Sequence, residues 1–230
     1  MKLHVIRSHR FVIGSLVALL LLVAAAYAGP PLICHSIEIG QAKSLPWISH
    51  NWNLSGSENY DLKNLVPDTL AILDSNTPVL VRMETLRRAT LYARKDPQIA
   101  KELLTKLHAR ATSAESSGHP DALAWFDAGY LAEAYKQWHG KDSQNPATGL
   151  DGYAWVTKSI GLRGHDPQME FAAALITLEG AQRDHHEHVL RATAGAKADP
   201  LLAQNLSTHF MGNNGQTISE MFAKATTPNE

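Results

Sequence analysis

The sequence predicts an all-α fold built from helices that stack against one another. The stretch from Pro120 to His139 carries two neighbouring apolar stripes at helical spacing and only a narrow polar edge. A helix with two apolar stripes has to be covered on two sides, as it is inside a stack of helices. The Asp-Pro pairs that begin at Asp96, Asp166 and Asp199 start further helices. Plentiful Ala and an aromatic content of 7% favour close helix packing over a β-sandwich.

The two stripes of this central helix define the face that we expect to be buried. The main stripe steps by four, three, four and three residues and consists of Ala124, Ala128, Leu131, Tyr135 and Trp138. The second stripe lies beside it and consists of Leu123, Phe126, Tyr130 and Ala134. We expect Leu131, on the main stripe, to be a core residue.

Residues 1–28 have the pattern of a secretory signal peptide. A positively charged start is followed by an apolar run from Phe11 to Ala26 and by an A-x-A cleavage site that ends at Ala28. The apolar run is shorter than the roughly 20 residues that a helix needs to span a bilayer. We therefore expect export to the periplasm or the extracellular space, with a mature chain that starts at Gly29. An uncleaved signal segment that anchors the chain in a membrane is the alternative.

Residues 29–61 are expected to form an extended arm and a polar linker. Gly29–Trp52 lacks helical periodicity, and the polar linker follows it at Ser55–Asp61. The opening of the arm, PPLICHSIEIGQAKSLPW, is similar to the mature starts of some uncharacterised exported bacterial proteins with helical repeats, and this resemblance implies no function. The arm also holds the only cysteine of the chain, Cys34, which is followed by His35. A lone thiol in an oxidising compartment can pair between chains, bind a metal or stay buried as a small hydrophobe, so Cys34 and His35 are a candidate redox site.

Residues 62–226 are expected to form the helical domain. Besides the central helix, the expected helices are Leu65–Asp74, one that starts at Pro78 with Thr77 as its cap, one after Asp96, Asp151–Leu162, one after Asp166, Arg183–Ala194, one after Asp199, and a last one after the capping box Thr217–Glu220. In the helix after Pro78, four arginines lie mostly away from the apolar face: Arg82, Arg87, Arg88 and Arg94. We interpret them as a solvated face, with a site for an acidic partner as the alternative.

The Asp-Pro starts have a spacing that indicates repeated helix pairs. Pro97 and Pro167 lie 70 residues apart, and Pro167 and Pro200 lie 33 apart. These distances are close to two units and one unit of about 35 residues, a length typical of helix-pair repeats.

The central helix also resembles part of a known repeat. Trp125 followed by Ala128-Gly129 resembles the first helix of the tetratricopeptide (TPR) repeat, in which a Trp precedes a pair of small residues. Ala132 departs from the pattern, because the TPR repeat has Tyr there, and a polar loop at 140–149 follows. The resemblance covers residues 78–210 and implies an α-solenoid or TPR-like stack of antiparallel helix pairs. A compact helical bundle is the alternative.

The sequence shows no motif of a known active site. It has no H-E-x-x-H, G-x-S-x-G, Walker, G-x-G-x-x-G or C-x-x-C pattern, so we expect no cofactor and interpret the chain as non-enzymatic. The formal charge is -1, and loss of residues 1–28 removes three cations and no acid, which makes it -4. This balance does not favour a nucleic-acid partner, and it provides no polybasic patch for a membrane surface.

The segment Asp184-His185-His186-Glu187-His188 is the candidate metal site. On a helix His185 and His188 are three residues apart and Asp184 and His188 are four apart, so either pair can present two ligands to one ion. His186 points about 100° away from His185, and further ligands would have to come from elsewhere. A metal-binding protein or metalloenzyme that uses this cluster is therefore the alternative function, and a solvated helix face is the simpler interpretation.

Several aromatic residues are candidates for contact with a partner. They are Trp125, Tyr130, Tyr135, Trp138 and Trp155, which either line a ligand groove or belong to the core. Helical-repeat proteins bind extended partners on their surfaces. The sequence thus favours an exported scaffold that binds a protein or peptide partner, with an enzyme assembled from scattered residues as a further alternative.

Overall fold

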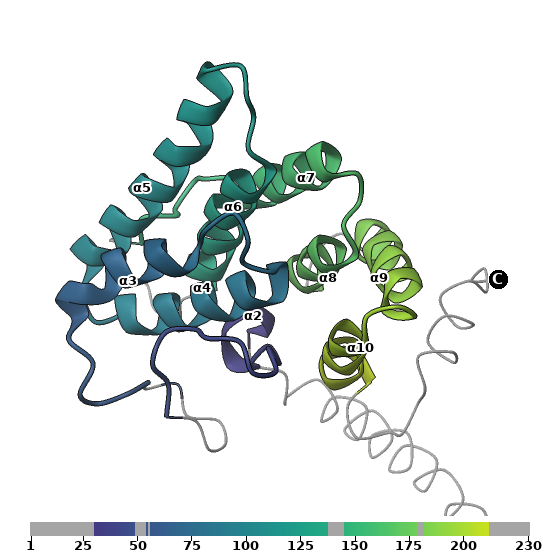
Figure 1. Cartoon of the computed structure of the whole chain (residues 1–230), viewed down its shortest axis with the longest axis horizontal. Coiled ribbons are helices and arrows are strands. Elements are labelled where there is room, and N and C mark those ends of the chain that lie inside the picture. Colours follow the sequence, from purple (N-terminus) through teal and green to yellow (C-terminus); the bar gives the residue numbers. More distant parts are fainter. Residues whose placement is uncertain (1–29, 49–53, 55, 138–144, 179–181, 212–230) are drawn as a thin grey trace, which may run out of the picture. The chain divides into compact units, whose positions relative to one another are not determined.

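The computed structural model describes residues 30–48, 54, 56–137, 145–178 and 182–211, and their regular structure is entirely helical (Figure 1). The elements in chain order are α2 (Pro31–Cys34), the 3-10 turn η1 (Leu62–Asn64), α3 (Leu65–Ile72), α4 (Val79–Ala93), α5 (Pro97–Ser116), α6 (Ala122–Lys136), α7 (Gly152–Arg163), α8 (Pro167–Ile176), α9 (Gln182–Ala196), α10 (Pro200–Leu206) and the π-helical turn η2 (Ser207–Met211). The expected all-α stack of helices is confirmed. The signal segment, Trp138 and the capping box at 217–220 lie outside the described residues.

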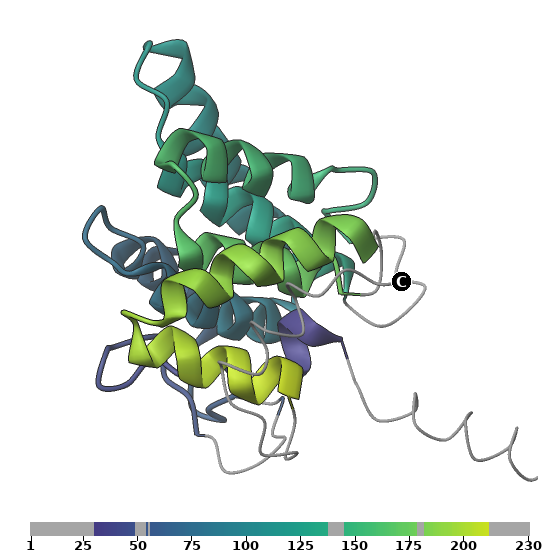
Figure 2. The ribbon, with the colours of Figure 1, turned by 90° about the vertical axis from the view of Figure 1, so that its right-hand side faces the viewer.

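The central helix α6 is covered on several sides. It contacts α4, α5, α7 and α8, while α8 packs on α9 and α9 on α10. Figure 2 shows α9 and α10 lying next to each other. The described members of both predicted stripes are buried, and Leu131 is 0% exposed. The stripes of α6 therefore supply much of the core, as their spacing predicts.

Aspartates cap most of the helices. The carboxylates of Asp96, Asp166 and Asp199 each accept hydrogen bonds from the second and third amides of α5, α8 and α10, and Asp121 does the same for α6. Each cap satisfies amides that have no partner inside the helix. The expected cap of α4 is different, because α4 begins at Val79, one residue later than expected. The Thr77 hydroxyl bonds instead to the carbonyl of Ile72, in the preceding helix.

The helices α6 and α7 approach each other closely through two glycines. A Cβ placed on Gly129 would lie 2.6 Å from the carbonyl oxygen of Gly152, and a Cβ on Gly152 would lie 2.6 Å from that of Gly129. Neither position has room for a side chain without a shift of backbone. Gly129, the second residue of the Ala128-Gly129 pair that resembles the TPR motif, therefore lies at the contact between α6 and α7.

The N-terminal arm is part of the same core and is less irregular than expected. Its first residues form the short helix α2, which contacts α4, α6 and α8. Leu32, Ile37 and Leu45 are buried. Asn205 also holds the arm. Its side-chain oxygen accepts from the backbone amide of Glu38 at 2.8 Å, and its side-chain nitrogen donates to the backbone carbonyl of Glu38 at 2.9 Å.

Three of the four arginines of α4 contradict the expected solvated face, because they point into the protein. Arg82 and Arg87 are buried, Arg88 is half-buried, and only Arg94 is exposed. Arg87 donates to the carbonyl of Ile33 and Arg88 to that of Leu45, so both hold the arm. Both guanidinium groups pair with the single, fully buried carboxylate of Glu84.

A helix that crosses a bilayer has to be both long and apolar. Among the described residues, no helix combines the length and the apolar character that a membrane span needs.

Candidate functional site

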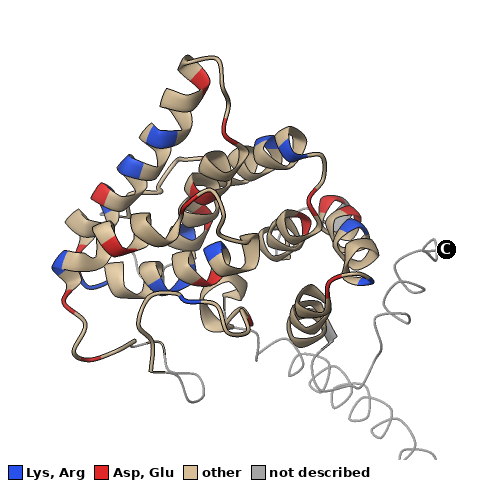
Figure 3. Cartoon of the chain, in the orientation of Figure 1, with Lys and Arg blue, Asp and Glu red and all other residues tan. Residues whose placement is uncertain are grey.

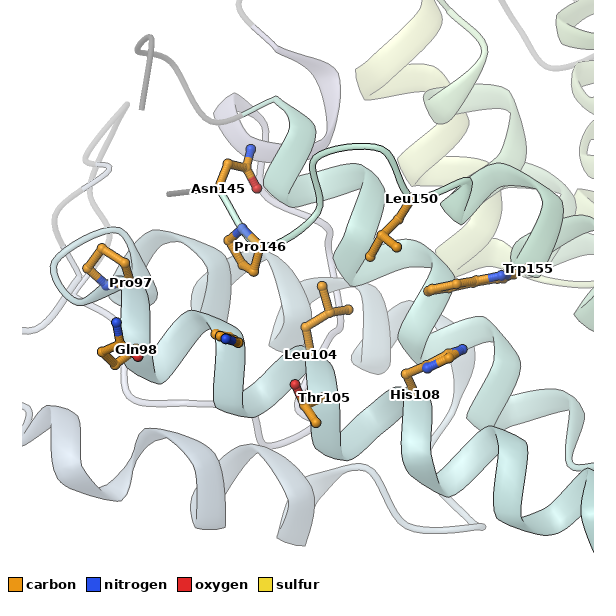
Figure 4. A pocket seen from close by; sticks show the side chains of 10 residues that line it. Pro97, Gln98, Leu104, Thr105, His108, Asn145, Pro146, Leu150 and Trp155 are labelled. Atoms are coloured by element: carbon orange, nitrogen blue, oxygen red, sulfur yellow. The ribbon is translucent and has the colours of Figure 1, made fainter. Parts of the chain in front are cut away.

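A groove of about 590 Å³ runs along one side of α5 (Figure 4). Its two long walls come from different parts of the chain. One is the side of α5 that begins at Pro97, and the other is the loop from Asn145 to Leu150 together with Trp155 of α7. This volume lies in the range of small-molecule and short-peptide sites.

The α5 wall carries four polar side chains in one line. They are Gln98, Lys101, Thr105 and His108, whose spacing of three, four and three residues puts them on one stripe of a helix. Gln98, Lys101 and Thr105 are exposed, and none of these three side chains has a hydrogen bond or an ion pair within the described part of the chain. Polar groups that line a cavity and have no partner in the protein are available to a ligand.

The opposite wall is held in place before any ligand arrives. The side-chain amide of Asn145 donates to the carbonyl of Tyr135 at 2.6 Å and accepts from the amide of Ala147 at 3.0 Å. Two backbone bonds, from Thr148 to Asn145 and from Leu150 to Ala147, close the turn, and Ala147 is fully buried. The loop therefore presents Pro146 and Leu150 to the groove as a fixed apolar surface.

Aromatic rings close one end of the groove. The imidazole of His108 stacks on the ring of Trp155, with centroids 4.5 Å apart and planes at 17°. Trp125 packs on both rings from below the surface and is 5% exposed. Lys158 covers Trp125 at 4.1 Å and pairs with Glu115, so this end is held by packing and by an ion pair. Figure 4 shows His108 and Trp155 facing each other across the two helices.

The described lining of the groove carries a positive charge. Within the described residues, Lys101 is the charged residue of this lining, and no Asp or Glu belongs to it. Figure 3 shows basic and acidic residues together along α5, and elsewhere on this helix they pair, as Lys106 does with Glu102 at 3.3 Å. Lys101 has no such counter-ion within the described residues.

The five aromatic candidates from the sequence occupy different places. Trp155 lines the groove, and Trp125 supports it from behind. Tyr130 and Tyr135 are 0% exposed and belong to the core, so they offer no surface to a partner. Trp138 lies outside the described residues.

The three metal candidates have different surroundings. Asp184 is exposed, and Nδ1 of His185 donates to the carbonyl of Ala174 at 2.9 Å. Nδ1 of His188 lies 2.5 Å from Oε2 of Glu170, and its Nε2 lies 2.8 Å from the hydroxyl of Tyr153. Both ring nitrogens of His188 are therefore engaged, and among the described residues no group of three or more His, Cys, Asp or Glu could hold an ion.

Glu170 is the residue that sequence reasoning missed in this region. Its fully buried carboxylate bonds to His188 and to Nδ1 of His165, with Arg191 at 3.6 Å. Burial acts to raise the pKa of Glu170, but the hydrogen bonds from the two histidines outweigh it and hold the pKa below its usual range. The contacts of Glu170 and His188 join α7, α8 and α9. We therefore interpret this cluster as an ion network that stabilises the fold.

The candidate redox pair lies beside α4. Cys34 is half-buried, and burial raises the pKa of its thiol although Arg87 and Arg94 oppose that effect. Burial also lowers the pKa of His35, whose ring packs on His209 at 5.7 Å. A raised thiol pKa means less of the reactive thiolate at neutral pH, which favours the interpretation of Cys34 as a packed residue.

The polar stripe of the groove could have been found from its spacing, but its role could not. The residues Gln98, Lys101 and Thr105 look like any exposed helix face in the sequence. Only the loop at 145–150, brought to α5 by the fold, turns that face into one wall of a groove. No protein-family model, no curated protein and no solved structure matches this chain, so the assignment rests on the geometry alone.

Proposed function

We propose that this chain is an exported, non-enzymatic helical scaffold that binds an extended peptide segment of a partner protein in the groove along α5. The observation that carries the proposal is the pairing of two different walls. A line of polar side chains, of which Gln98, Lys101 and Thr105 have no hydrogen bond or ion pair within the described residues, faces a fixed apolar wall made by Pro146, Leu150 and Trp155. Such a surface suits a ligand that has hydrogen-bonding groups on one edge and apolar groups on the other.

The length of the polar stripe fits a short extended peptide. From Gln98 to His108 the helix rises by roughly 15 Å, at about 1.5 Å per residue. An extended chain advances about 3.3 Å per residue, so four or five residues cover that distance. Alternate side chains of an extended peptide point in opposite directions, so one set can face α5 and the other can face Leu150 and Trp155.

The repeat architecture and the export signal complete the proposal. The period of the Asp-Pro starts supports a TPR-like array of helix pairs, in which surfaces of stacked helices bind extended partners. The charged start, apolar run and A-x-A site of residues 1–28 support export and cleavage before Gly29. N-terminal sequencing of the exported protein tests this part, and a membrane-bound chain that still begins at Met1 would refute cleavage.

Peptide binding is tested by panning a library of displayed heptapeptides against the mature protein. Binding of the recovered peptides is then measured with the variants Thr105→Trp and Ser113→Trp. Both residues are exposed on α5, but only Thr105 lines the groove, so a Trp there fills it while Ser113→Trp is the matched control. We expect Thr105→Trp to abolish binding and Ser113→Trp to preserve it. Recovered peptides that bind both variants equally, or a library that yields none, would contradict the proposal.

A further inference from the structure

We infer that the groove along α5 selects acidic peptides, in which the carboxylate of an Asp or Glu side chain pairs with Lys101 and apolar side chains alternate with the acidic ones. This inference rests on the proposed peptide-binding function and specifies the chemistry of the ligand.

The first step is the charge of the groove. Lys101 is exposed on α5 and has no ion pair within the described part of the chain. Glu102, the acid next to Lys101 in the sequence, pairs with Lys106 at 3.3 Å. Among the residues that the structure describes, no carboxylate lines the groove. An anionic ligand therefore gains a counter-ion there, and a cationic ligand meets an unneutralised like charge.

The second step is the position of Lys101 along the groove. It stands three residues after Gln98 and four before Thr105, on the same stripe, so it lies in the middle of the polar wall. A carboxylate paired with Lys101 has the side-chain amide of Gln98 on one side and the hydroxyl of Thr105 on the other. The peptide that fits is therefore anchored by an internal acidic side chain, and a free chain terminus is not required.

The third step is the apolar wall that faces α5. Pro146 and Leu150 belong to this wall, Trp155 closes one end of it beside His108, and the turn that carries Pro146 is held by its own hydrogen bonds. In an extended peptide the residues on either side of an acidic one point away from α5 and toward this wall. The selected pattern is thus an alternation of acidic and apolar residues over four or five positions.

The expected size of the effect follows from the exposure of the pair. Exposed ion pairs contribute little, so Lys101→Ala should weaken binding of an acidic peptide by about two- to five-fold. Reversal of the charge in Lys101→Glu replaces attraction by repulsion and should reverse the preference. Salt should weaken the binding of acidic peptides, since exposed charges are screened within roughly 10 Å at 0.1 M.

The test uses three acetylated and amidated pentapeptides that differ only in charge. Their sequences alternate Leu with Glu, Leu with Gln, or Leu with Lys, and binding is measured by fluorescence anisotropy with wild type, Lys101→Glu and Lys63→Glu. Lys63 is exposed on η1, outside the groove, and controls for the change in net charge. We expect wild type and Lys63→Glu to bind the Glu peptide most tightly and the Lys peptide least. Lys101→Glu should show the opposite order.

Several results would overturn the inference without affecting the proposed function. One is that panning yields peptides that Thr105→Trp excludes but that show no enrichment of Asp or Glu. A second is that Lys63→Glu changes the order of the three peptides as strongly as Lys101→Glu does, since the preference would then reflect overall charge. A third comes from one additional peptide, the Gln sequence with a free carboxyl terminus. If it binds as tightly as the amidated Glu peptide, Lys101 recognises a chain terminus and not an acidic side chain.

Discussion

Nη1 of Arg82 lies 2.6 Å from Oδ2 of Asp127, and both side chains are fully buried between α4 and α6. The guanidinium also donates to the carbonyls of Thr77 and Asp74, so it joins the loop before α4 to the central helix. Oδ1 of Asp127 has no hydrogen-bond partner within the described residues. The pair therefore fixes the position of α4 against α6. One oxygen of the Asp127 carboxylate stays buried without a hydrogen bond from the described residues.

Removal of the carboxylate should destabilise the protein strongly. In Asp127→Ala the charge of Arg82 stays buried without a counter-ion, and we expect the free energy of unfolding to fall by about 3–5 kcal/mol. Urea unfolding measures the change. The control is Glu102→Ala, which breaks an exposed ion pair of α5 and should cost about 1 kcal/mol or less. Equal losses in the two variants would show that Arg82 reaches water once Asp127 is gone.

The same carboxyl group should make stability depend on pH. Burial raises the pKa of Asp127 to about 7, although Arg82 acts to lower it. An unfolded Asp has a pKa of about 3.9, so between these values the folded state holds a proton that the unfolded state has lost. The stability that this proton contributes to the folded state is fully present below about pH 3.9 and is lost as the pH rises through about 7.

Asp127→Asn isolates this effect, because it keeps an oxygen that can accept from Arg82 but has no titrating group. The unfolding free energy of wild type relative to the variant should fall from about pH 4 to about pH 7, by at most ~1.4 kcal/mol per pH unit, and should be constant above that. Urea unfolding of both proteins across this range provides the comparison. A relative stability that rises with pH would mean that the pair lowers the pKa of Asp127.

Loss of the charge on Glu84 should release the N-terminal arm. Glu84 accepts from Arg87, from Arg88 and from the amide of Ile37 at 2.9 Å. In Glu84→Gln the two arginines lose their counter-ion, and we expect a loss of roughly 3 kcal/mol in unfolding free energy. Hydrogen exchange at the amide of Ile37 should accelerate as well. Glu115→Gln, at an exposed pair, is the control, and unchanged exchange at Ile37 would show that other contacts suffice to hold the arm.

The close approach of α6 and α7 predicts opposite effects for two Gly→Ala changes. At Gly129 a Cβ would overlap the carbonyl of Gly152, so Gly129→Ala should destabilise by about 1–3 kcal/mol. Gly161 is exposed on α7, and a Cβ added there would meet no atom within 4 Å, so Gly161→Ala should stabilise by about 0.5–1 kcal/mol. Thermal unfolding distinguishes the two. Stabilisation by both changes would mean that α6 and α7 separate easily.

The core position of Leu131 gives a direct test of the stack. Leu131→Ala removes a side chain that is 0% exposed from the middle of α6, and we expect a loss of about 2–5 kcal/mol. Urea unfolding gives the value. An unchanged midpoint would place this face of α6 on the surface.

The helices were predictable because their signals are local. The apolar stripes of α6 and the caps at Asp96, Asp166 and Asp199 depend on residues within a few positions of each other. The arginines of α4 were misplaced for the opposite reason. Arg87 is buried and Arg88 is half-buried because they donate to the carbonyls of Ile33 and Leu45, which lie more than 40 residues away in the chain. Helical periodicity cannot show that a distant backbone segment will supply acceptors for a buried guanidinium.

The candidate groove was predictable only in part. An aromatic residue near a ligand could be proposed from composition, and Trp155 does line the groove. The polar wall was not recognised, because an exposed row that includes Lys101 and Thr105 has the same pattern as an ordinary solvated face. Its significance depends on the distance between α5 and the loop at 145–150, which is a tertiary property.

The pairing of Glu38 with Asn205 has a consequence for how the chain folds. The two residues are 167 positions apart, so the arm is synthesised well before Asn205, the residue that holds it. Until the C-terminal helices exist, the arm lacks this partner, and contacts across such a separation carry a large loop-closure entropy. Folding rates fall as the mean separation of contacting residues grows. The arm should therefore be among the last segments to become ordered, and the protein should fold more slowly than helical proteins whose contacts are all local.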